Sequence, residues 1–214
     1  MSVITTEGII IKRSNFGEAD RILTVITPYK GKIKIVAKGV RRITSRRGGN
    51  VELLNKVKLH IYEGKGMPIL TEAQSVETFP KIKSDLMMST YGSYIMELSE
   101  KLLPEEQPNP AAYQLIASIL GLLETNPRQI FIRAFELKLL SVMGYWSPNE
   151  ISVTSEIKDL LEKLQRETWE NIEKMNITKN QAMELEKIVR YYIEKILEHP
   201  LQSVKILQRL KQNG

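Results

Sequence analysis

The spacing of apolar residues changes once along this chain of 214 residues, and no other feature constrains the fold as strongly. Up to about Phe79 the chain consists of short β-rich runs, two of which have apolar residues at every second position, whereas after Pro80 the apolar residues recur at intervals of about 3.6. The first period is that of a β-strand and the second that of an α-helix. The sequence therefore predicts an α+β protein with a β-rich domain over 1–79 and a helical domain over 80–214.

The β-rich part contains five short runs that are typical of strands, separated by glycine, proline and asparagine. The runs cover residues 3–12, 21–27, 32–37, 57–62 and 69–76. Alternation is strict in the third and fourth runs, so Ile33 and Ile35 can enter a core while Lys32 and Lys34 point the other way. Five short strands suit a small closed barrel, because closure leaves no exposed strand edge.

The helical part carries clear start and stop signals. Asn109 and Asn126 each precede a proline, which is the pattern of an N-cap followed by proline at the first helical position, and Gly144 is a typical helix end. Thr178 and Gln181 have the spacing of a capping box. We expect helices over about 86–102, 110–124, 127–143, 157–164, 178–197 and 203–210, packed as a bundle.

Positive charge is concentrated in the β-rich part. The formal net charge is +6, and residues 1–80 hold 14 Lys and Arg against 7 Asp and Glu, whereas the remaining residues hold 17 against 18. Five of these cations lie within 38–47, a glycine- and serine-containing segment in which phosphates could approach the backbone. This asymmetry is typical of a polyanion-binding module joined to a second unit, the alternative being a solvated surface.

Nucleic acid is the polyanion that this pattern favours, because membrane-surface binding usually relies on a basic amphipathic helix rather than on strands and loops. We expect the cations of the β-rich part to contact phosphates and exposed aromatic residues to stack on bases. The predicted cations are Lys12, Arg13, Arg21, Lys32, Lys34, Lys38, Arg41, Arg42, Arg46 and Arg47, and the predicted aromatic residues are Phe16 and Tyr29.

Several classes of function are excluded or disfavoured. The chain has no cysteine, which rules out disulfides, iron–sulfur clusters and cysteine-based zinc sites, and it has only two histidines. Its glycines lack the spacing of a phosphate-binding loop. No run of apolar residues is long enough for a membrane span or a secretion signal. We therefore expect a cytoplasmic protein that is not an enzyme, holds no metal or cofactor and does not bind membranes.

A series of short segments also follows the order and spacing of a known family. The segments are EGIIIK at 7–12, GEADRILT at 17–24, GKIKIVAKGVRR at 31–42, SR at 45–46, YEGKG at 62–66, LTEA at 70–73, LLSVMGY at 139–145 and LQSVKIL at 201–207. Together they resemble the RecO family of bacterial recombination mediators. The resemblance is dense over residues 3–79 and looser in the helical part.

This resemblance implies an N-terminal OB-fold barrel followed by a helical domain. It also implies a protein that binds single- and double-stranded DNA and anneals complementary strands. Such a protein contacts RecR and the single-strand-binding protein and helps to load RecA during DNA repair. When bound to DNA, it would be associated with the nucleoid. Many members carry a four-cysteine zinc module after the segment that corresponds to 139–145. This chain has no cysteine, so zinc is not carried over.

The resemblance further implies that the helical domain receives the acidic C-terminal tail of the single-strand-binding protein. Such a tail needs cations beside a small apolar pocket. Arg128 and Arg133 flank Ile130 near the expected start of a helix, and Lys138 could extend the same strip, although ordinary solvated cations are the alternative. For the whole chain, the alternative function is a non-specific RNA-binding OB-fold protein with a helical interaction domain.

Overall fold

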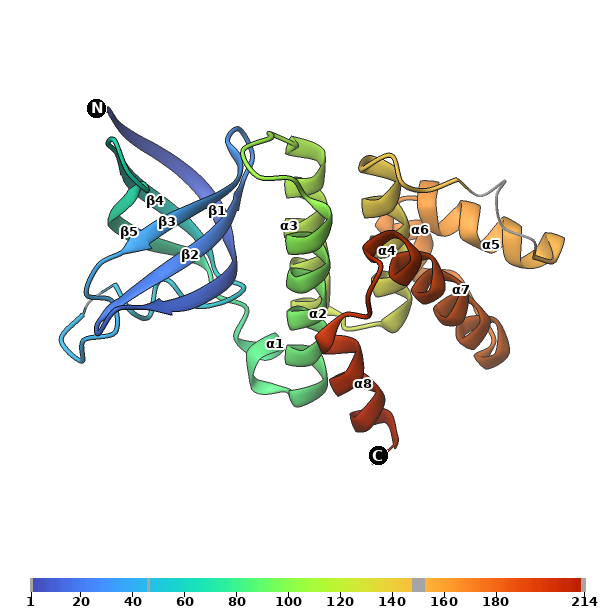
Figure 1. Cartoon of the computed structure of the whole chain (residues 1–214). Helices are drawn as coiled ribbons and strands as arrows, with labels where there is room; N and C mark the ends of the chain where they lie inside the picture. The colour runs from blue at the N-terminus through green and yellow to red at the C-terminus, as the bar shows by residue number, and fades with distance from the viewer. Residues whose placement is uncertain (1, 46, 148–152, 213–214) are drawn as a thin grey trace.

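The computed structural model describes residues 2–45, 47–147 and 153–212, in which five strands precede eight helices (Figure 1). The strands are β1 (Ser2–Phe16), β2 (Asp20–Thr27), β3 (Gly31–Ala37), β4 (Lys56–Glu63) and β5 (Ile69–Glu77). The helices are α1 (Pro80–Ser84), α2 (Leu86–Leu102), α3 (Pro110–Thr125), α4 (Gln129–Val142), α5 (Ser155–Arg166), α6 (Trp169–Glu173), α7 (Lys179–Leu197) and α8 (Gln202–Gln212).

The five strands form a closed barrel in the order β1-β2-β3-β5-β4, in which β1 also pairs with β4. All pairings are antiparallel except the one between β3 and β5, which is a single parallel pair of Val36 with Ile69. A five-stranded barrel with one weakly paired seam is the architecture of the OB-fold. The predicted barrel and its strand positions are confirmed, with β1 extending to Phe16 because its hairpin with β2 continues to that residue.

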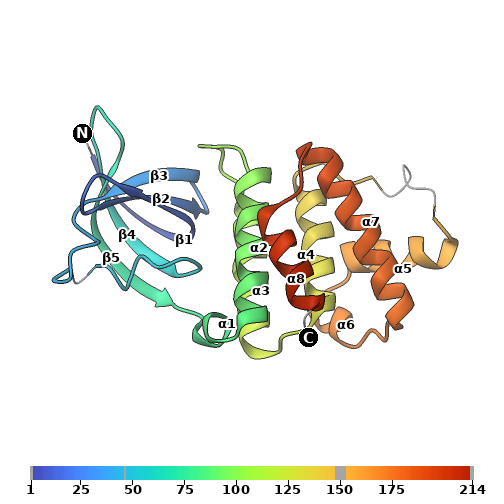
Figure 2. The same ribbon diagram turned by 60° about the horizontal axis from the view of Figure 1, so that its bottom comes forward.

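The barrel has an apolar interior and one apolar patch on its outside. Val25, Ile35 and Leu59 are fully buried inside the barrel. Ile9 and Ile26 are also buried, but they belong to the same core as the helices. In Figures 1 and 2 helices α2 and α3 stand between the barrel and helices α4 to α7. One side of the barrel is therefore covered by helices and is closed to a ligand.

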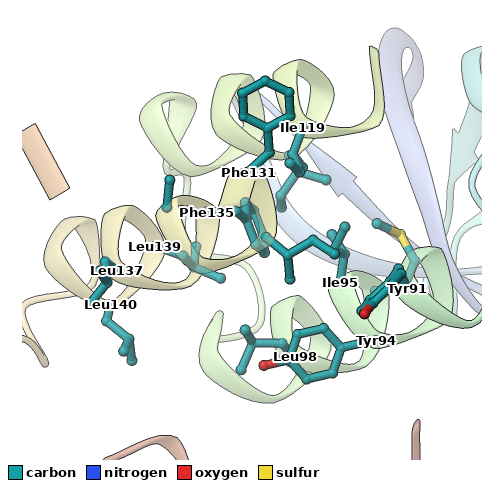
Figure 3. Packing of buried hydrophobic residues seen from close by; sticks show 14 of the residues in the cluster. Tyr91, Tyr94, Ile95, Leu98, Ile119, Phe131, Phe135, Leu137, Leu139 and Leu140 are labelled. Atoms are coloured by element: carbon teal, nitrogen blue, oxygen red, sulfur yellow. The ribbon is translucent and has the colours of Figure 1, made fainter. Parts of the chain in front are cut away.

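The helical core lies between α2, α3 and α4, where the phenyl rings of Phe131 and Phe135 are completely buried (Figure 3). The predicted N-cap Asn109 and the capping box of Thr178 with Gln181 are both confirmed. In the described parts of the chain, no helix has the length and apolar character that crossing a membrane requires.

One expectation for the helices was wrong, and two short helices were missed. Asn126 does not start a helix: its N–H donates to the carbonyl of Leu122, 2.7 Å away, and so ends α3, and α4 begins only at Gln129. Helix α7 ends at Leu197, as expected, and Glu198 follows it with a left-handed φ of 61°. Helices α1 and α6 were not predicted, because five residues are too few to show a helical period.

Candidate nucleic-acid interface

The segment 38–47, which we call the basic loop, leaves β3 and is tied to the turn between β1 and β2. The N–H of Gly39 donates to Oδ1 of Asp20 at 2.7 Å. The N–H of Arg41 donates to the carbonyl of Ala19 at 3.0 Å, and its Nη1 donates to the carbonyl of Gly17 at 3.2 Å. Gly39 has a φ of +65°, which glycine adopts without strain. These contacts fix the start of the basic loop against the barrel.

Arg47 fixes the other end of the basic loop. Its Nη1 donates to the carbonyls of Leu70 and Thr71, each at 3.1 Å, and its Nη2 donates to the carbonyl of Lys38 at 3.0 Å. The sequence predicted a phosphate contact for Arg47. The structure instead places its guanidinium against backbone carbonyls of β5 and of the loop itself, where it holds the loop in place.

Three predicted cations of the basic loop, Lys38, Arg41 and Arg42, are exposed, and no residue in the described ranges forms an ion pair with any of them. Lys38 and Arg42 line a surface hollow of about 640 Å³ together with Ser45. Predicted residue Arg46 lies outside the described residues. The basic loop therefore presents guanidinium and ammonium groups that are available to an anion.

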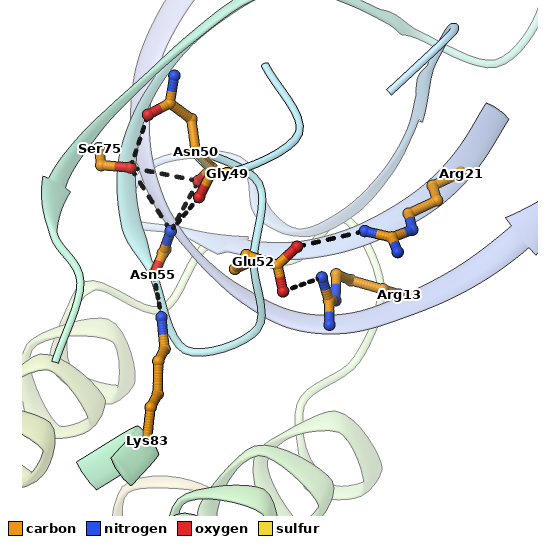
Figure 4. A network of polar contacts seen from close by, with 8 residues as sticks. All are labelled: Arg13, Arg21, Gly49, Asn50, Glu52, Asn55, Ser75 and Lys83. Atoms are coloured by element: carbon orange, nitrogen blue, oxygen red, sulfur yellow. Dashed lines mark hydrogen bonds and ion pairs between the residues drawn. The ribbon is translucent and has the colours of Figure 1, made fainter. Parts of the chain in front are cut away.

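Two other predicted cations, Arg13 and Arg21, share one carboxylate (Figure 4). Both guanidinium groups form ion pairs with Glu52, which lies between the basic loop and β4, and the Arg21 pair measures 3.4 Å. Next to this group, Lys83 of α1 donates to Oδ1 of Asn55, and burial lowers the pKa of Lys83. The contacts join the β3–β4 connection to β1, β2 and α1, so part of the predicted positive charge is used inside the protein.

The cations of β3 face the helices. Lys32 is only 7% exposed, and its Nζ donates to the carbonyl of Glu100 in α2 at 2.6 Å. Lys32 was predicted to lie on the face opposite Ile33 and Ile35, and α2 covers that face of the barrel, so the side chain of Lys32 is buried. Burial lowers the pKa of Lys32. Lys34 pairs with Glu105, and Lys12 of β1 pairs with Glu100 at 3.0 Å.

The two predicted aromatic residues are exposed but lie at opposite ends of β2. Phe16 is 51% exposed and precedes the turn to which the basic loop is tied. Tyr29 is 78% exposed and follows β2, where it lines a second hollow of about 750 Å³ with Met67 and Pro68. Since β2 has eight residues, its ends are about 25 Å apart. Only Phe16 lies at the same end of the barrel as the basic loop.

In the helical part, Arg128, Ile130 and Arg133 line a mainly apolar pocket of about 570 Å³. Its opposite wall contains Lys179 and Met183 of α7, which sequence reasoning did not identify. These two residues lie about fifty positions further along the chain, so no local pattern links them to α4. The only sequence pattern near either residue is the capping box of Thr178 with Gln181, which places Lys179 at the start of α7 but does not indicate a pocket.

The third predicted partner residue, Lys138, lies outside this pocket. Its Nζ donates to the carbonyls of Gln165 at 3.0 Å and Glu167 at 2.6 Å, and it stands 5.5 Å from the ring centroid of Trp169. Burial lowers its pKa. Arg128 and Arg133 are thus brought together around one pocket, whereas Lys138 caps the carbonyls at the end of α5.

Arg133 is held by a buried polar cluster. Its Nη2 lies 2.9 Å from Oε1 of Glu136, a residue with no exposed surface, and the hydroxyl of Tyr94 donates to the same oxygen. Burial raises the pKa of Glu136 and that of Tyr94. Burial alone would lower the pKa of Arg133, but the combined effect of Glu136, Tyr94, Glu186 and Tyr91 outweighs burial and raises this pKa. The guanidinium is therefore a fixed positive charge at the pocket wall.

The comparisons with known proteins follow the same division of the chain. The sequence model described as Recombination protein O N terminal matches residues 1–79, and the one described as Recombination protein O C terminal matches residues 83–146. This chain belongs to the RecO family. The basic loop lies within the first match, and the α4 wall of the pocket lies within the second. The α7 wall lies beyond both matches.

Curated relatives in the RecO family support this assignment. The DNA repair protein RecO of Symbiobacterium thermophilum is 35% identical over 147 residues, which are 68% of this chain and 58% of the relative. The DNA repair protein RecO of Acetivibrio thermocellus is 37% identical over 164 residues, which are 74% of this chain and 65% of the relative. The matched region thus spans somewhat more than half of the length of these relatives.

The family resemblance raised the question of a metal, since many members carry a zinc module. The described residues contain no group of three or more His, Asp or Glu placed to hold a metal ion, and the sequence has no cysteine. The four cysteines of that module therefore have no counterpart in this sequence.

Proposed function

We propose that this chain is a recombination mediator of the RecO type that acts in DNA repair by binding single- and double-stranded DNA through the basic loop. The observation that carries the proposal is the set of exposed cations Lys38, Arg41 and Arg42 on a fixed loop at one end of the barrel, which form no ion pair with any described residue. When exposed cations of this kind bind phosphates, the counterions condensed on the DNA are released. This release drives binding without regard to base sequence.

Strand annealing follows from the same chemistry. Two DNA strands repel each other through their phosphates, and a loop that neutralises the backbone lowers this repulsion while the bases remain free to pair. Arg41 and Arg42 supply guanidinium groups that can bind phosphate through two N–H donors, and Phe16 offers a ring for a base at the same end of the barrel. We propose that RecR and RecA act with this DNA complex during recombinational repair, RecA being loaded indirectly.

The division of labour we propose assigns DNA to residues 1–79 and protein partners to residues 80–214. An acidic peptide with an apolar last residue matches the pocket between α4 and α7. Arg128, Arg133 and Lys179 can bind its carboxylates, and Ile130 and Met183 can contact its apolar end. The C-terminal tail of the single-strand-binding protein, implied by the family resemblance, has this chemistry.

DNA binding is tested with the variant Lys38→Ala/Arg41→Ala/Arg42→Ala. Loss of three phosphate contacts should reduce the slope of log affinity against log salt by about 2 for single-stranded DNA, since each contact contributes about 0.7. Fluorescence anisotropy at several salt concentrations measures this slope. A matched control replaces three exposed lysines of the helical part, Lys174, Lys187 and Lys195, with alanine.

The triple variant of the basic loop and its control have the same net charge, so they separate a local effect from a general one. Equal affinities and slopes for the two would reject the basic loop as the DNA site.

Titration with RNA of the same sequence addresses the alternative function, because tighter binding to RNA than to DNA would favour an RNA-binding protein. Annealing should proceed without ATP and in the presence of EDTA; inhibition by EDTA would indicate a metal requirement.

The partner site needs a carefully chosen substitution. Arg133→Glu would place a second carboxylate beside the buried Glu136 and would disturb the fold as well as the pocket. Lys179→Glu changes an exposed pocket residue, and Lys187→Glu on the same helix is its control. A peptide copy of the acidic tail should bind at micromolar order, about −8 kcal/mol, and roughly tenfold more weakly to Lys179→Glu. Unchanged tail binding by that variant would exclude this pocket.

A further inference from the structure

The basic loop carries a fully exposed apolar side chain. Ile43 is 106% exposed, which is the highest value among the large apolar residues that the structure describes; the next is Tyr29 at 78%. Both of its neighbours in the chain, Arg42 and Thr44, line the hollow of the basic loop. An isoleucine in this position does not pack in the core of the protein.

The backbone presents Ile43 at the corner of a tight turn. The N–H of Ser45 donates to the carbonyl of Arg42 at 2.9 Å, which places Ile43 and Thr44 at the two central positions of a β-turn. A second bond runs from the N–H of Arg42 to the carbonyl of Gly39 at 3.2 Å, immediately after the anchor to Asp20. The turn is therefore attached to the barrel.

The chemistry of the side chain matches one part of a DNA molecule. Phosphates and sugars are polar, and the flat faces of the bases are the apolar surface that DNA offers. Isoleucine is branched at Cβ and therefore stiff, and apolar side chains of this kind serve as wedges between base steps in many DNA-binding proteins. The cations Arg41 and Arg42 beside it would hold the backbone on either side of such a wedge.

We infer that Ile43 inserts between adjacent base pairs of duplex DNA and unstacks them when the basic loop binds the phosphates. This inference rests on the proposed function, because it requires the basic loop to bind DNA. It adds a local opening of the duplex to a binding mode that otherwise involves only the backbone. Such an opening would assist the exchange between paired and unpaired strands.

The experiment uses the full chain and a DNA duplex that contains 2-aminopurine, whose fluorescence rises when it is unstacked. Binding of the unmodified chain should raise the emission severalfold, and Ile43→Leu should keep most of this rise. Ile43→Ser should lose most of it and weaken duplex binding by roughly tenfold, in line with the apolar area that an inserted isoleucine buries. Its salt slope should not change, because the cations are intact.

The matched control is Ile206→Ser on α8, a substitution of a half-exposed isoleucine outside the basic loop, which should leave the emission rise unchanged. A duplex complex that forms without a rise in emission would overturn the wedge and leave the proposed DNA binding intact. An equal rise for Ile43→Ser would do the same. If the unmodified chain binds no DNA, both the wedge and the proposed function are wrong.

Discussion

The buried cluster of Arg133, Glu136 and Tyr94 allows a sharp prediction about stability. Glu136 has no exposed surface and Arg133 has a side-chain exposure of 15%, so the two charges have little access to water. Replacing Glu136 with leucine conserves most of the volume but leaves the guanidinium without its counter-charge. It also removes the acceptor of the Tyr94 hydroxyl. We expect Glu136→Leu to lower the free energy of unfolding.

The magnitude follows from the two losses. Leaving one partner of a buried ion pair alone costs about 3–5 kcal/mol, and we take the lower end because Arg133 borders a pocket that water can enter. A buried hydroxyl without an acceptor adds about 1 kcal/mol. The expected loss is therefore about 4 kcal/mol. In contrast, the triple variant Arg133→Met/Glu136→Leu/Tyr94→Phe removes all members of the cluster and should lose about 1 kcal/mol or less.

Urea denaturation followed by tryptophan fluorescence measures both values. The chain has two tryptophans, both in the helical part: Trp146 packs on Tyr192 with ring centroids 4.9 Å apart, and Trp169 packs on Phe131 at 6.1 Å. Their emission therefore reports on the unfolding of the region that contains the cluster. A loss below about 1 kcal/mol for Glu136→Leu, or an equal loss for the single and triple variants, would refute the reasoning about the buried charge.

Three further predictions concern cations of the barrel and of the basic loop. Arg47→Ala should lower the free energy of unfolding by about 2 kcal/mol through its lost hydrogen bonds, whereas Arg42→Ala should leave it unchanged; thermal melts compare the two. Lys34 pairs with Glu105 beside the helices and not in the basic loop, so Glu105→Gln should leave the salt slope for single-stranded DNA unchanged, measured by anisotropy. Burial lowers the pKa of Lys32, so between this lowered pKa and the ordinary value of 10.5 the unfolded state binds more protons than the folded state. The free energy of unfolding should therefore rise with pH in that window, and less so in Lys32→Met.

Each of these has a clear contrary outcome. Equal melting temperatures for Arg47→Ala and Arg42→Ala would show that the carbonyl contacts of Arg47 contribute nothing to stability. A salt slope steepened by about 0.7 in Glu105→Gln would show that Lys34 reaches DNA. Parallel pH profiles for the unmodified chain and Lys32→Met would show that Lys32 is not the titrating group.

The sequence by itself determined the elements of secondary structure and the class of fold. The two-residue alternation over 32–35 and the helical spacing after Pro80 are local patterns, and each reports which side of an element is buried. Capping is equally local, because the side chains of Asn109 and Thr178 bond to backbone N–H groups three residues away. The barrel followed from strand number and length, and these expectations could be made without knowing any long-range contact.

Only the tertiary structure decided which cations are free. Lys32 alternates correctly for an exposed residue, but α2, nearly seventy residues later in the chain, covers it. Glu52 and Glu105 lie far in sequence from the cations with which they pair. Whether a cation is available to a ligand depends on the carboxylates and carbonyls that folding brings within a few ångströms of it. Interactions between charges weaken with distance, so the number of charges in a sequence segment does not show which cations are paired. The pocket between α4 and α7 was hidden for the same reason, since its two walls meet only after the helices pack.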